Sequence, residues 1–249
     1  MTSEKSTTSA PTSTYRLQLG PGLTLDDAAG LLDYLDRLGV GALYLSPMLT
    51  AAPGSSHGYD VVDPTRVSPE LGGDTAREAL TAKAHALGMG VVADIVPNHM
   101  SVVRADANPW WWDVLAHGRK SVYAHYFDVD FDAGPILIPV LGDDGDGGEA
   151  ALAELTIDGD RLLYHDKGYP LAPGTHAPGD TVAQVHGRQH YRLVSWRRGN
   201  GELTYRRFFD VSELAAVRVE DPEVFEAVHA EILRWAAQGR LDGLRVDHV

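Results

Sequence analysis

The feature that most constrains the fold is an almost unbroken apolar run, Val91-Val92-Ala93-Asp94-Ile95-Val96. A strand with one face in water alternates apolar and polar residues, whereas a parallel strand covered on both faces is apolar throughout. The run therefore predicts a parallel strand inside an α/β domain. Its single charged residue, Asp94, is costly to bury unless it is paired. It either accepts backbone hydrogen bonds in a structural role or belongs to a site.

Strand and helix patterns alternate around this run. Alternating residues predict a strand over 15–19, and an apolar run predicts another over 42–45, followed by a long loop over 46–73. The order β-α-β-α-β, then α-β, is that of half an eight-stranded barrel or of an open doubly wound sheet. Three helices are expected: from Thr24, in a capping box with Asp27, to Gly39; from Asp74, as N-cap, to Gly88; and from Asp221, with Pro222 at the first helical position, to Gly239.

The rhythm breaks between Met100 and Asp210, which predicts an inserted subdomain that is irregular or β-rich. Within it, Asp158-Gly159 predicts a hairpin with a type I′ turn. The run from Trp110 to Trp112 is expected to pack or to anchor a loop, and the stretch from Asp143 to Asp146 is expected to be a solvated loop. The predicted organisation is a disordered lead-in over 1–13, barrel units over 14–99, the insertion over 100–213, and the last helix and strand over 214–249.

Composition limits the classes of function. The 249 residues are 44% hydrophobic, enough for a sizeable core, and carry a formal net charge of -14. This charge has the wrong sign for a nucleic-acid partner or an anionic membrane, and it is compatible with a neutral sugar. The absence of cysteine excludes a disulfide scaffold and a thiolate site, and fits a cytoplasmic location. No apolar run is long enough to predict a transmembrane helix.

The chain ends on a segment that is predicted to be a short buried strand, Gly243-Leu244-Arg245-Val246-Asp247-His248-Val249. Side chains two apart on a strand share a face, so Arg245 and Asp247 should point the same way. They form either a structural ion pair or part of a site. Because no turn or cap follows, we expect the chain to be a piece of a longer protein.

Polar residues follow three of the predicted parallel strands, at the end where α/β folds place their sites. They are His57-Gly58-Tyr59-Asp60, then Asp94 with Asn98 and His99, and finally Arg245 with Asp247. A structural interpretation exists for each group: loop packing for the first, a backbone-bonded acid and a turn for the second, and an ion pair for the third.

The order and placement of these segments resemble the α-amylase superfamily (glycoside hydrolase family 13). Asp94-Ile95-Val96-Pro97-Asn98-His99 is similar to its first conserved region, and Gly243-Leu244-Arg245-Val246-Asp247 to its second. The resemblance implies the N-terminal half of a (β/α)8 TIM barrel, strands 1–4, with an irregular or β subdomain inserted after strand 3. Five segments show a narrower resemblance, to the superfamily's trehalose-forming glucan isomerases. They are Tyr44–Pro47, Gly54–Asp60, Leu71–Gly73, Leu203–Asp210 and the ending Arg245–Val249.

The resemblance also implies roles for single residues. Asp247 would be the catalytic nucleophile, and Arg245 would keep it ionised and oriented. Asp94 and Asn98 would be structural at the site; Asn98 aligns with a calcium position of many amylases, but no metal and no cofactor is expected here. The substrate-binding residues would be Tyr59, stacking under the sugar; Asp60, pairing with the arginine; His99, donating to sugar hydroxyls; and His57 and His248.

The implied reaction converts the reducing-end α-1,4 bond of a maltooligosaccharide into an α,α-1,1 bond, with retention through a glycosyl-enzyme on Asp247. The superfamily carries its acid/base Glu and its third acidic residue after the fifth and seventh strands. This chain has neither strand, so we expect it to be inactive alone. One alternative is an amylase-type hydrolase or another transglucosylase. A second is a non-catalytic glucan-binding module with the tryptophan run as its platform.

Overall fold

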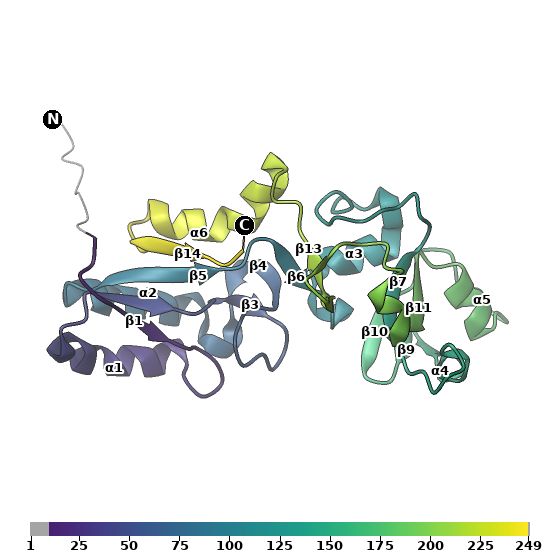
Figure 1. The fold of residues 1–249 in the computed structure, drawn as a ribbon, viewed down its shortest axis with the longest axis horizontal. Helices are drawn as coiled ribbons and strands as arrows, with labels where there is room; N and C mark the ends of the chain where they lie inside the picture. Colours follow the sequence, from purple (N-terminus) through teal and green to yellow (C-terminus); the bar gives the residue numbers. More distant parts are fainter. Residues whose placement is uncertain (1–9, 249) are drawn as a thin grey trace. The chain divides into compact units, whose positions relative to one another are not determined.

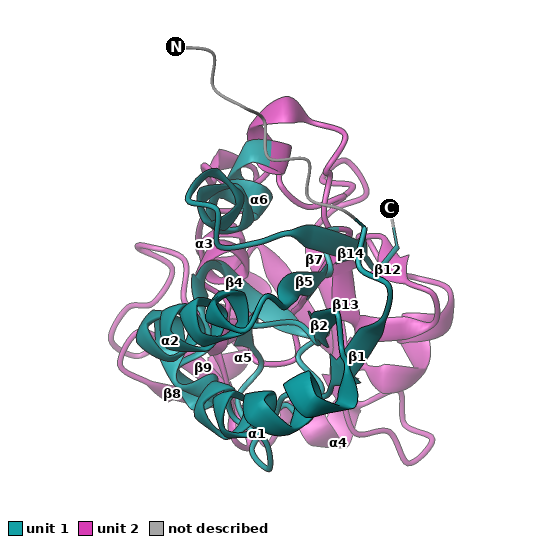
Figure 2. Ribbon diagram, turned by 90° about the vertical axis from the view of Figure 1, so that its left-hand side faces the viewer, with its two compact units in different colours: residues 1–97, 226–249 teal, residues 98–225 magenta. Residues whose placement is uncertain are grey.

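The computed structural model describes residues 10–248, which form two compact units (Figure 2). Unit 1 consists of the chain up to Pro97 and from Glu226 onward, and unit 2 of Asn98–Phe225. Residues 1–9 of the lead-in expected over 1–13 lie outside the described residues. Val249, the last residue of the predicted terminal strand, also lies outside them. Within the described part, the Ser13 carbonyl accepts a hydrogen bond from the Ala42 N–H at 3.0 Å.

Unit 1 is built on a parallel four-stranded sheet in the order β1-β2-β5-β14. Its last strand is distant in sequence from its neighbour, so that β14 returns to lie beside β5 (Figure 1). The helix α6 (Pro222–Ala237) begins in unit 2 and lies mostly in unit 1. The other elements are β1 (Thr14–Leu17), α1 (Leu25–Leu38), β2 (Ala42–Leu45), β3 (Leu49–Ala51), β4 (Val61–Val67), the 3-10 turn Pro69–Leu71, α2 (Gly73–Ala86), β5 (Gly90–Ile95) and β14 (Gly243–Val246).

The two faces of this sheet differ because successive side chains of a strand point to opposite sides. One face packs under α1, α2 and α6, which lie along the outside of the curved sheet (Figure 2). The other face carries polar side chains from three strands, among them Tyr44, Asp94 and Arg245. The apolar face contributes Leu17, Leu43, Leu45, Val91, Ala93 and Ile95 to a core shared with Leu32, Leu35, Leu80, Ile232 and Trp235 of the helices.

Two of the predicted helix starts are confirmed. The Thr24 hydroxyl accepts from the Asp27 N–H at 3.3 Å, and the Asp27 carboxylate accepts from the Thr24 N–H at 2.9 Å. The Asp221 carboxylate accepts from the Glu223 N–H at 2.9 Å, ahead of α6. None of the helices in the described residues is long and apolar enough to cross a membrane.

The expected N-cap of α2 is wrong. The helix begins at Gly73, and its N-cap is Gly72, whose φ of 105° lies in the left-handed region that glycine adopts most easily. Asp74 is instead inside the first turn, where its carboxylate forms ion pairs with Arg77 at 2.7 Å and with Arg234 at 3.0 Å. The acid therefore joins α2 to α6 rather than starting a helix.

A β-hairpin occupies part of the segment expected to be a long loop. Strands β3 and β4 pair antiparallel from Leu49↔Val67 to Ala51↔Val61, with two register shifts. Those shifts and Pro64 inside β4 hide the strand pattern in the sequence, because proline cannot donate to a ladder.

Unit 2 contains three small sheets and short helices. The parallel pair β11-β7, the antiparallel sheet β10-β9-β8 and the antiparallel sheet β12-β13-β6 account for its strands. The elements are β6 (His99–Ser101), the 3-10 turn Ala105–Ala107, α3 (Pro109–His117), the 3-10 turn Gly118–Lys120, β7 (Ile136–Leu141), α4 (Glu149–Leu152), β8 (Thr156–Asp158), β9 (Arg161–Tyr164), β10 (Lys167–Pro170), α5 (Val182–Gly187), β11 (Tyr191–Ser195), the 3-10 segment Trp196–Asn200, β12 (Arg207–Phe208) and β13 (Val211–Ala216).

The hairpin predicted in unit 2 is present, but its turn type is wrong. Asp158 pairs with Arg161, so Gly159 and Asp160 form the loop. A type I′ turn needs positive φ at both loop residues. Gly159 has φ 59°, whereas Asp160 is absent from the described non-glycine residues with positive φ.

The tryptophan run packs, as expected. Trp110 and Trp111 of α3 are 7% and 1% exposed, and Trp111 meets the rings of Phe127 and Tyr205 edge-on at 5.0 and 5.5 Å. The acidic stretch differs from the expectation at Asp143, whose side chain is only 5% exposed. It accepts hydrogen bonds from backbone N–H groups and from the Ser195 hydroxyl, so this residue organises its loop from inside.

The terminal strand is also less buried than predicted. Leu244 and Val246 of β14 are 45% and 41% exposed. Among the described residues β14 pairs with β5 alone and lies at the edge of its sheet, so that nothing covers its second side.

Candidate functional site

Asp94 is the central side chain of the polar face of unit 1. Its position near the end of β5 turns it away from the helices, and its side chain is fully buried. One carboxylate oxygen, Oδ2, accepts hydrogen bonds from the Tyr44 hydroxyl at 2.8 Å and the Tyr59 hydroxyl at 2.6 Å. The other, Oδ1, accepts from Arg245 at 3.0 Å. The hydrogen bonds to this buried carboxylate therefore come from side chains rather than from the backbone.

Arg245 connects Asp94 to Asp247. It is the register partner of Asp94 across β14 and β5, and its Nη1 lies 3.0 Å from Asp94 Oδ1 and 2.5 Å from Asp247 Oδ1. The hydrogen bond to Asp94 is the largest cause that raises the pKa of Arg245 above its ordinary value, so the guanidinium stays charged. The expected pairing of Arg245 with Asp247 is confirmed. The Asp247 side chain is 17% exposed and remains reachable from solvent.

Tyr59 is brought to this group from the hairpin turn between β3 and β4. Besides donating to Asp94, its hydroxyl accepts from Arg16 Nη2 at 3.0 Å. Partial burial, followed by the hydrogen bond to Asp94, raises the pKa of Tyr59 to about 12, so the phenol is neutral near pH 7. Both bonds hold its ring in one orientation at the ends of the strands.

Sequence reasoning assigned no role to Arg16 and Tyr44, which complete the cluster. They are register partners on β1 and β2, and the Arg16 guanidinium lies 5.3 Å from the centre of the Tyr44 ring. The sequence signal that could have found them is the alternation of polar and apolar residues along a strand. Each lies between apolar residues and on the same face of the sheet as Asp94. Without knowledge of the strand register, nothing in the sequence aligns them with one another.

Asp60 does not make its expected pair with the arginine. Its carboxylate accepts from the Ser55 hydroxyl at 2.5 Å and lies 3.6 Å from His57 Nδ1. Arg245 already has two carboxylates beside it, and among the described residues Asp60 is not a third. His57 Nδ1 accepts from the Tyr59 N–H at 3.1 Å, so His57 and Asp60 shape the turn that presents Tyr59.

His99 and Asn98 belong to unit 2 and are described within it. His99, at the start of β6, is 2% exposed and stacks on Phe208 with ring centres 4.3 Å apart. Its Nδ1 lies 2.5 Å from Asn98 Oδ1, and since an amide oxygen only accepts, Nδ1 carries the proton. Phe208 packs edge-on against Phe209, which is 75% exposed and has φ 48°.

His248 follows directly after Asp247. Its Nε2 lies 4.0 Å from Asp247 Oδ1, and its φ of 54° lies in the left-handed region. No group of three or more His, Asp or Glu side chains within the described residues is arranged to hold a metal ion.

The chemistry open to this cluster is set by its two carboxylates. Asp94 accepts from Tyr44, Tyr59 and Arg245 and is sealed from solvent, so it can neither attack a substrate nor deliver a proton. Asp247 is reachable from solvent, and its carboxylate is paired with Arg245, an arrangement that suits a nucleophile. A retaining glycosidase needs a second, protonated carboxyl about 5 Å away. Asp94 does not meet that need.

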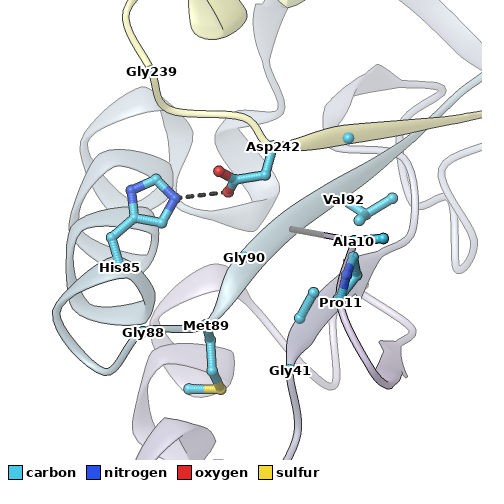
Figure 3. Close-up of a pocket in the computed structure, with 12 residues that line it drawn as sticks. Ala10, Pro11, Gly41, His85, Gly88, Met89, Gly90, Val92, Gly239 and Asp242 are labelled. Carbon is cyan, nitrogen blue, oxygen red and sulfur yellow. Dashed lines mark hydrogen bonds and ion pairs between the residues drawn. The ribbon is translucent and has the colours of Figure 1, made fainter. Parts of the chain in front are cut away.

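A hollow of about 620 Å³ opens at the opposite end of the same strands (Figure 3). Glycines at the starts of β5 and β14 form much of its wall, and His85 lies 2.8 Å from Asp242 beside it. Parallel α/β sheets place their chemistry at the carboxyl ends of the strands, so this hollow is not the candidate site.

Comparisons with known proteins agree with this geometry. Residues 24–249 match the family described as alpha amylase, catalytic domain. The chain is 53% identical over 245 residues to the putative maltooligosyl trehalose synthase of Mycobacterium tuberculosis, a match that covers 95% of this chain and 31% of that protein. The malto-oligosyltrehalose trehalohydrolase of Rhizobium sp. is 28% identical over 226 residues, covering 88% of this chain and 37% of that protein.

The structure of maltooligosyltrehalose synthase from Arthrobacter ramosus matches with a TM-score of 0.91 and 55% identity, over 96% of this chain and 31% of that one. The chain thus spans about a third of the length of the synthases it matches. The expected fold is confirmed, since β1, β2, β5 and β14 follow the strand order of a (β/α)8 barrel. Through the match over residues 24–249, the chain belongs to the alpha-amylase catalytic-domain family.

Proposed function

We propose that this chain supplies the nucleophile side of an active site that isomerises maltooligosaccharides to trehalose-ended products. The observation that carries the proposal is the triad of Asp94, Arg245 and Asp247 at the carboxyl ends of β5 and β14. The 53% identity to a putative maltooligosyl trehalose synthase supports the choice of reaction among those of the family.

In the proposed mechanism an Asp247 oxygen attacks the anomeric carbon at the last α-1,4 bond while that bond breaks. A protonated carboxyl gives its proton to the leaving oxygen. The released glucose turns over within the site, and its anomeric hydroxyl attacks the glycosyl-Asp247 ester and returns the proton to the same carboxyl. The product has the same composition as the substrate, so water must be excluded while the ester exists.

Each remaining residue has a proposed role. Tyr59 would stack under the sugar, fixed by its bonds to Asp94 and Arg16. His57 and Asp60 would position Tyr59, and His99 would donate to sugar hydroxyls, with Asn98 orienting its ring. His248 would border the nucleophile. Residues 100–213 would form the inserted subdomain, and residues 14–99 and 214–249 would form the barrel units.

The proposed partners are maltooligosaccharides and α-1,4-glucans, with no nucleic acid and no membrane, and the proposed location is the cytoplasm. The negative charge and the absence of cysteine support these choices. A glucan-binding module with the tryptophan run as its platform is disfavoured, because Trp110 and Trp111 are buried. A hydrolase of the same family differs only in the acceptor, which product analysis distinguishes.

A chimaera tests the reaction. This chain replaces its matching 245 residues in the Mycobacterium tuberculosis protein, and the products from maltopentaose are separated. A trehalose-ended product of unchanged length is expected, and it should vanish in the Asp247→Asn chimaera. Shortened glucans as the main products would instead identify a hydrolase.

A second experiment isolates the nucleophile in the 249-residue chain itself. A 5-fluoro-α-maltosyl fluoride needs no protonated carboxyl, because fluoride leaves without one. We expect an ester on Asp247 by peptide mass spectrometry, none in Asp247→Asn, and no conversion of maltopentaose. Labelling elsewhere would refute the role of Asp247. A trehalose-ended product from the chain alone would refute the expectation that it lacks the protonated carboxyl of the active site.

A further inference from the structure

Unit 2 contains a surface hollow that the proposed reaction does not use. It has a volume of about 290 Å³ and opens where the parallel strands β7 and β11 begin, next to the 3-10 turn after α3 (the strands are labelled in Figure 1). This volume is near the lower end of the range for small-molecule pockets, so a ligand would be small. The lining residues are Gly118, Arg119, Phe131, Gly134, Pro135, Gln189, His190 and Arg192.

The charge of this hollow is opposite to that of the chain. The whole sequence has 35 acidic residues against 21 Lys and Arg, yet the lining holds two arginines and a histidine and no acid. Burial lowers the pKa of His190, and the nearby His117 and Lys120 lower it further. Arg119, His190 and Arg192 thus line the hollow of an acidic protein, although Arg119 is paired with Asp132 and the nearby His117 with Asp113.

The guanidinium of Arg192 is held by backbone carbonyls. Its Nη1 donates to the carbonyls of His186 and Gln189 at 3.1 and 2.7 Å and to its own neighbour's at 2.7 Å, and its Nη2 donates to Gly187. Among the described residues Arg192 forms no ion pair with a carboxylate. The carbonyls fix the guanidinium in place without neutralising it. Its Nε–H and the second Nη2 proton remain available as donors.

Arg119 and Phe131 also line the hollow. The Arg119 guanidinium lies 5.7 Å from the centre of the Phe131 ring, and its Nη2 lies 2.5 Å from Asp132. That pair is 62% and 89% exposed, so it is weak and a dianion can displace it. The His190 ring packs closely against Gly118, where an added Cβ would lie 2.8 Å from it.

We propose that this hollow binds the phosphate group of a small phosphate monoester or of inorganic phosphate. Arginine forks match phosphate oxygens in charge and in planar geometry. Arg192, fixed and unneutralised, would form the base of the site. Arg119 and His190 would close on the phosphate, and the Phe131 ring would face the carbon part of an ester.

Calorimetry on the 249-residue chain in 0.15 M NaCl tests this site, with glucose 6-phosphate, inorganic phosphate and glucose as probes and with maltopentaose present to occupy the glucan site. We expect both phosphates to bind and glucose to give no heat. The Kd of the phosphates should rise by about tenfold in Arg119→Ala and in His190→Gln, since each removes a charge-assisted hydrogen bond. Arg37→Ala, which removes an exposed charge from α1, should leave the Kd unchanged.

The outcomes separate the sources of the phosphate. Tighter binding of glucose 6-phosphate than of inorganic phosphate identifies an ester site, and equal binding identifies a site for phosphate alone. The proposal is overturned by the absence of heat at millimolar phosphate, or by Arg119→Ala and Arg37→Ala having equal effects. Arg119 is exposed, so its variant should keep the circular dichroism spectrum of the parent. These results do not depend on trehalose formation.

Discussion

At the scale of single residues, Asp94 shows how a buried charge is maintained. Its fully buried carboxylate accepts from two phenols and one guanidinium, so its removal takes one acceptor away from three donors. We predict that Asp94→Ala lowers the free energy of unfolding by about 2–4 kcal/mol in urea titrations. Asp94→Asn should cost less, because an amide oxygen still accepts. The exposed Asp36→Asn is the control, and an equal loss there would contradict this account.

His186 is a second buried residue whose charge state matters. Its Nε2 accepts from the Leu193 N–H at 2.9 Å, and burial, with a smaller contribution from Arg192, lowers its pKa to about 4. The unfolded chain takes up this proton near pH 6.5 and the folded chain only near pH 4. Stability from this group is therefore complete above pH 6.5 and falls as the pH drops towards 4.

The test is the pH dependence of the unfolding free energy in the parent and in His186→Gln. Between pH 6.5 and 4 the unfolding free energy should depend more steeply on pH in the parent than in the variant. The difference in slope should correspond to at most about one bound proton, because both proteins have the same carboxylates. Parallel curves would show that His186 titrates alike in the folded and unfolded states.

At the scale of elements, helix termini were the most predictable features. The box formed by Thr24 and Asp27 was visible in the sequence and satisfies N–H groups that no helical carbonyl can reach. We predict that Thr24→Ala destabilises the chain by about 1 kcal/mol in denaturant titrations. Thr24→Ser keeps the hydroxyl and should lose less than half of that. A serine variant as unstable as the alanine variant would mean that the methyl group matters instead.

The start of α2 and the β3–β4 hairpin were not predicted, and the reason is physical. Asp74 is a residue type that is common at helix N-caps, but the N-cap of α2 has a left-handed backbone that suits Gly72. Asp74 instead forms ion pairs with Arg77 and Arg234. The β3–β4 hairpin was missed because its register shifts cancel the alternation on which recognition depends. Both outcomes were decided by contacts with residues distant in the sequence.

At the scale of the whole molecule, the sheet of unit 1 has two edges in the described residues, β1 and β14. Tyr15, Leu244 and Val246 on these edges are exposed, and edge strands with apolar side chains pair with other chains. We predict that the 249-residue chain self-associates and binds a hydrophobic dye, and that Leu244→Lys with Val246→Lys reduces both in light scattering. Leu38→Lys on α1, also exposed, is the control. A monomer with a sharp melt and no dye binding would refute the prediction.

The sequence by itself determined the alternating α/β order and three of the parallel strands of the barrel within a residue or two, because each depends on local periodicity. By residue type it singled out Asp94, Tyr59, Arg245 and Asp247 as site candidates, but not Arg16 and Tyr44. It also predicted that Arg245 and Asp247 lie together, and they are paired although Asp247 follows Val246, the last residue of β14. Tertiary structure decided the rest. It aligned β1, β2, β5 and β14 so that Arg16, Tyr44 and Tyr59 converge on Asp94, and it turned Asp60 towards Ser55 instead of the arginine. Strand register and loop conformation are set by packing between segments far apart in the chain, and no local pattern contains that information.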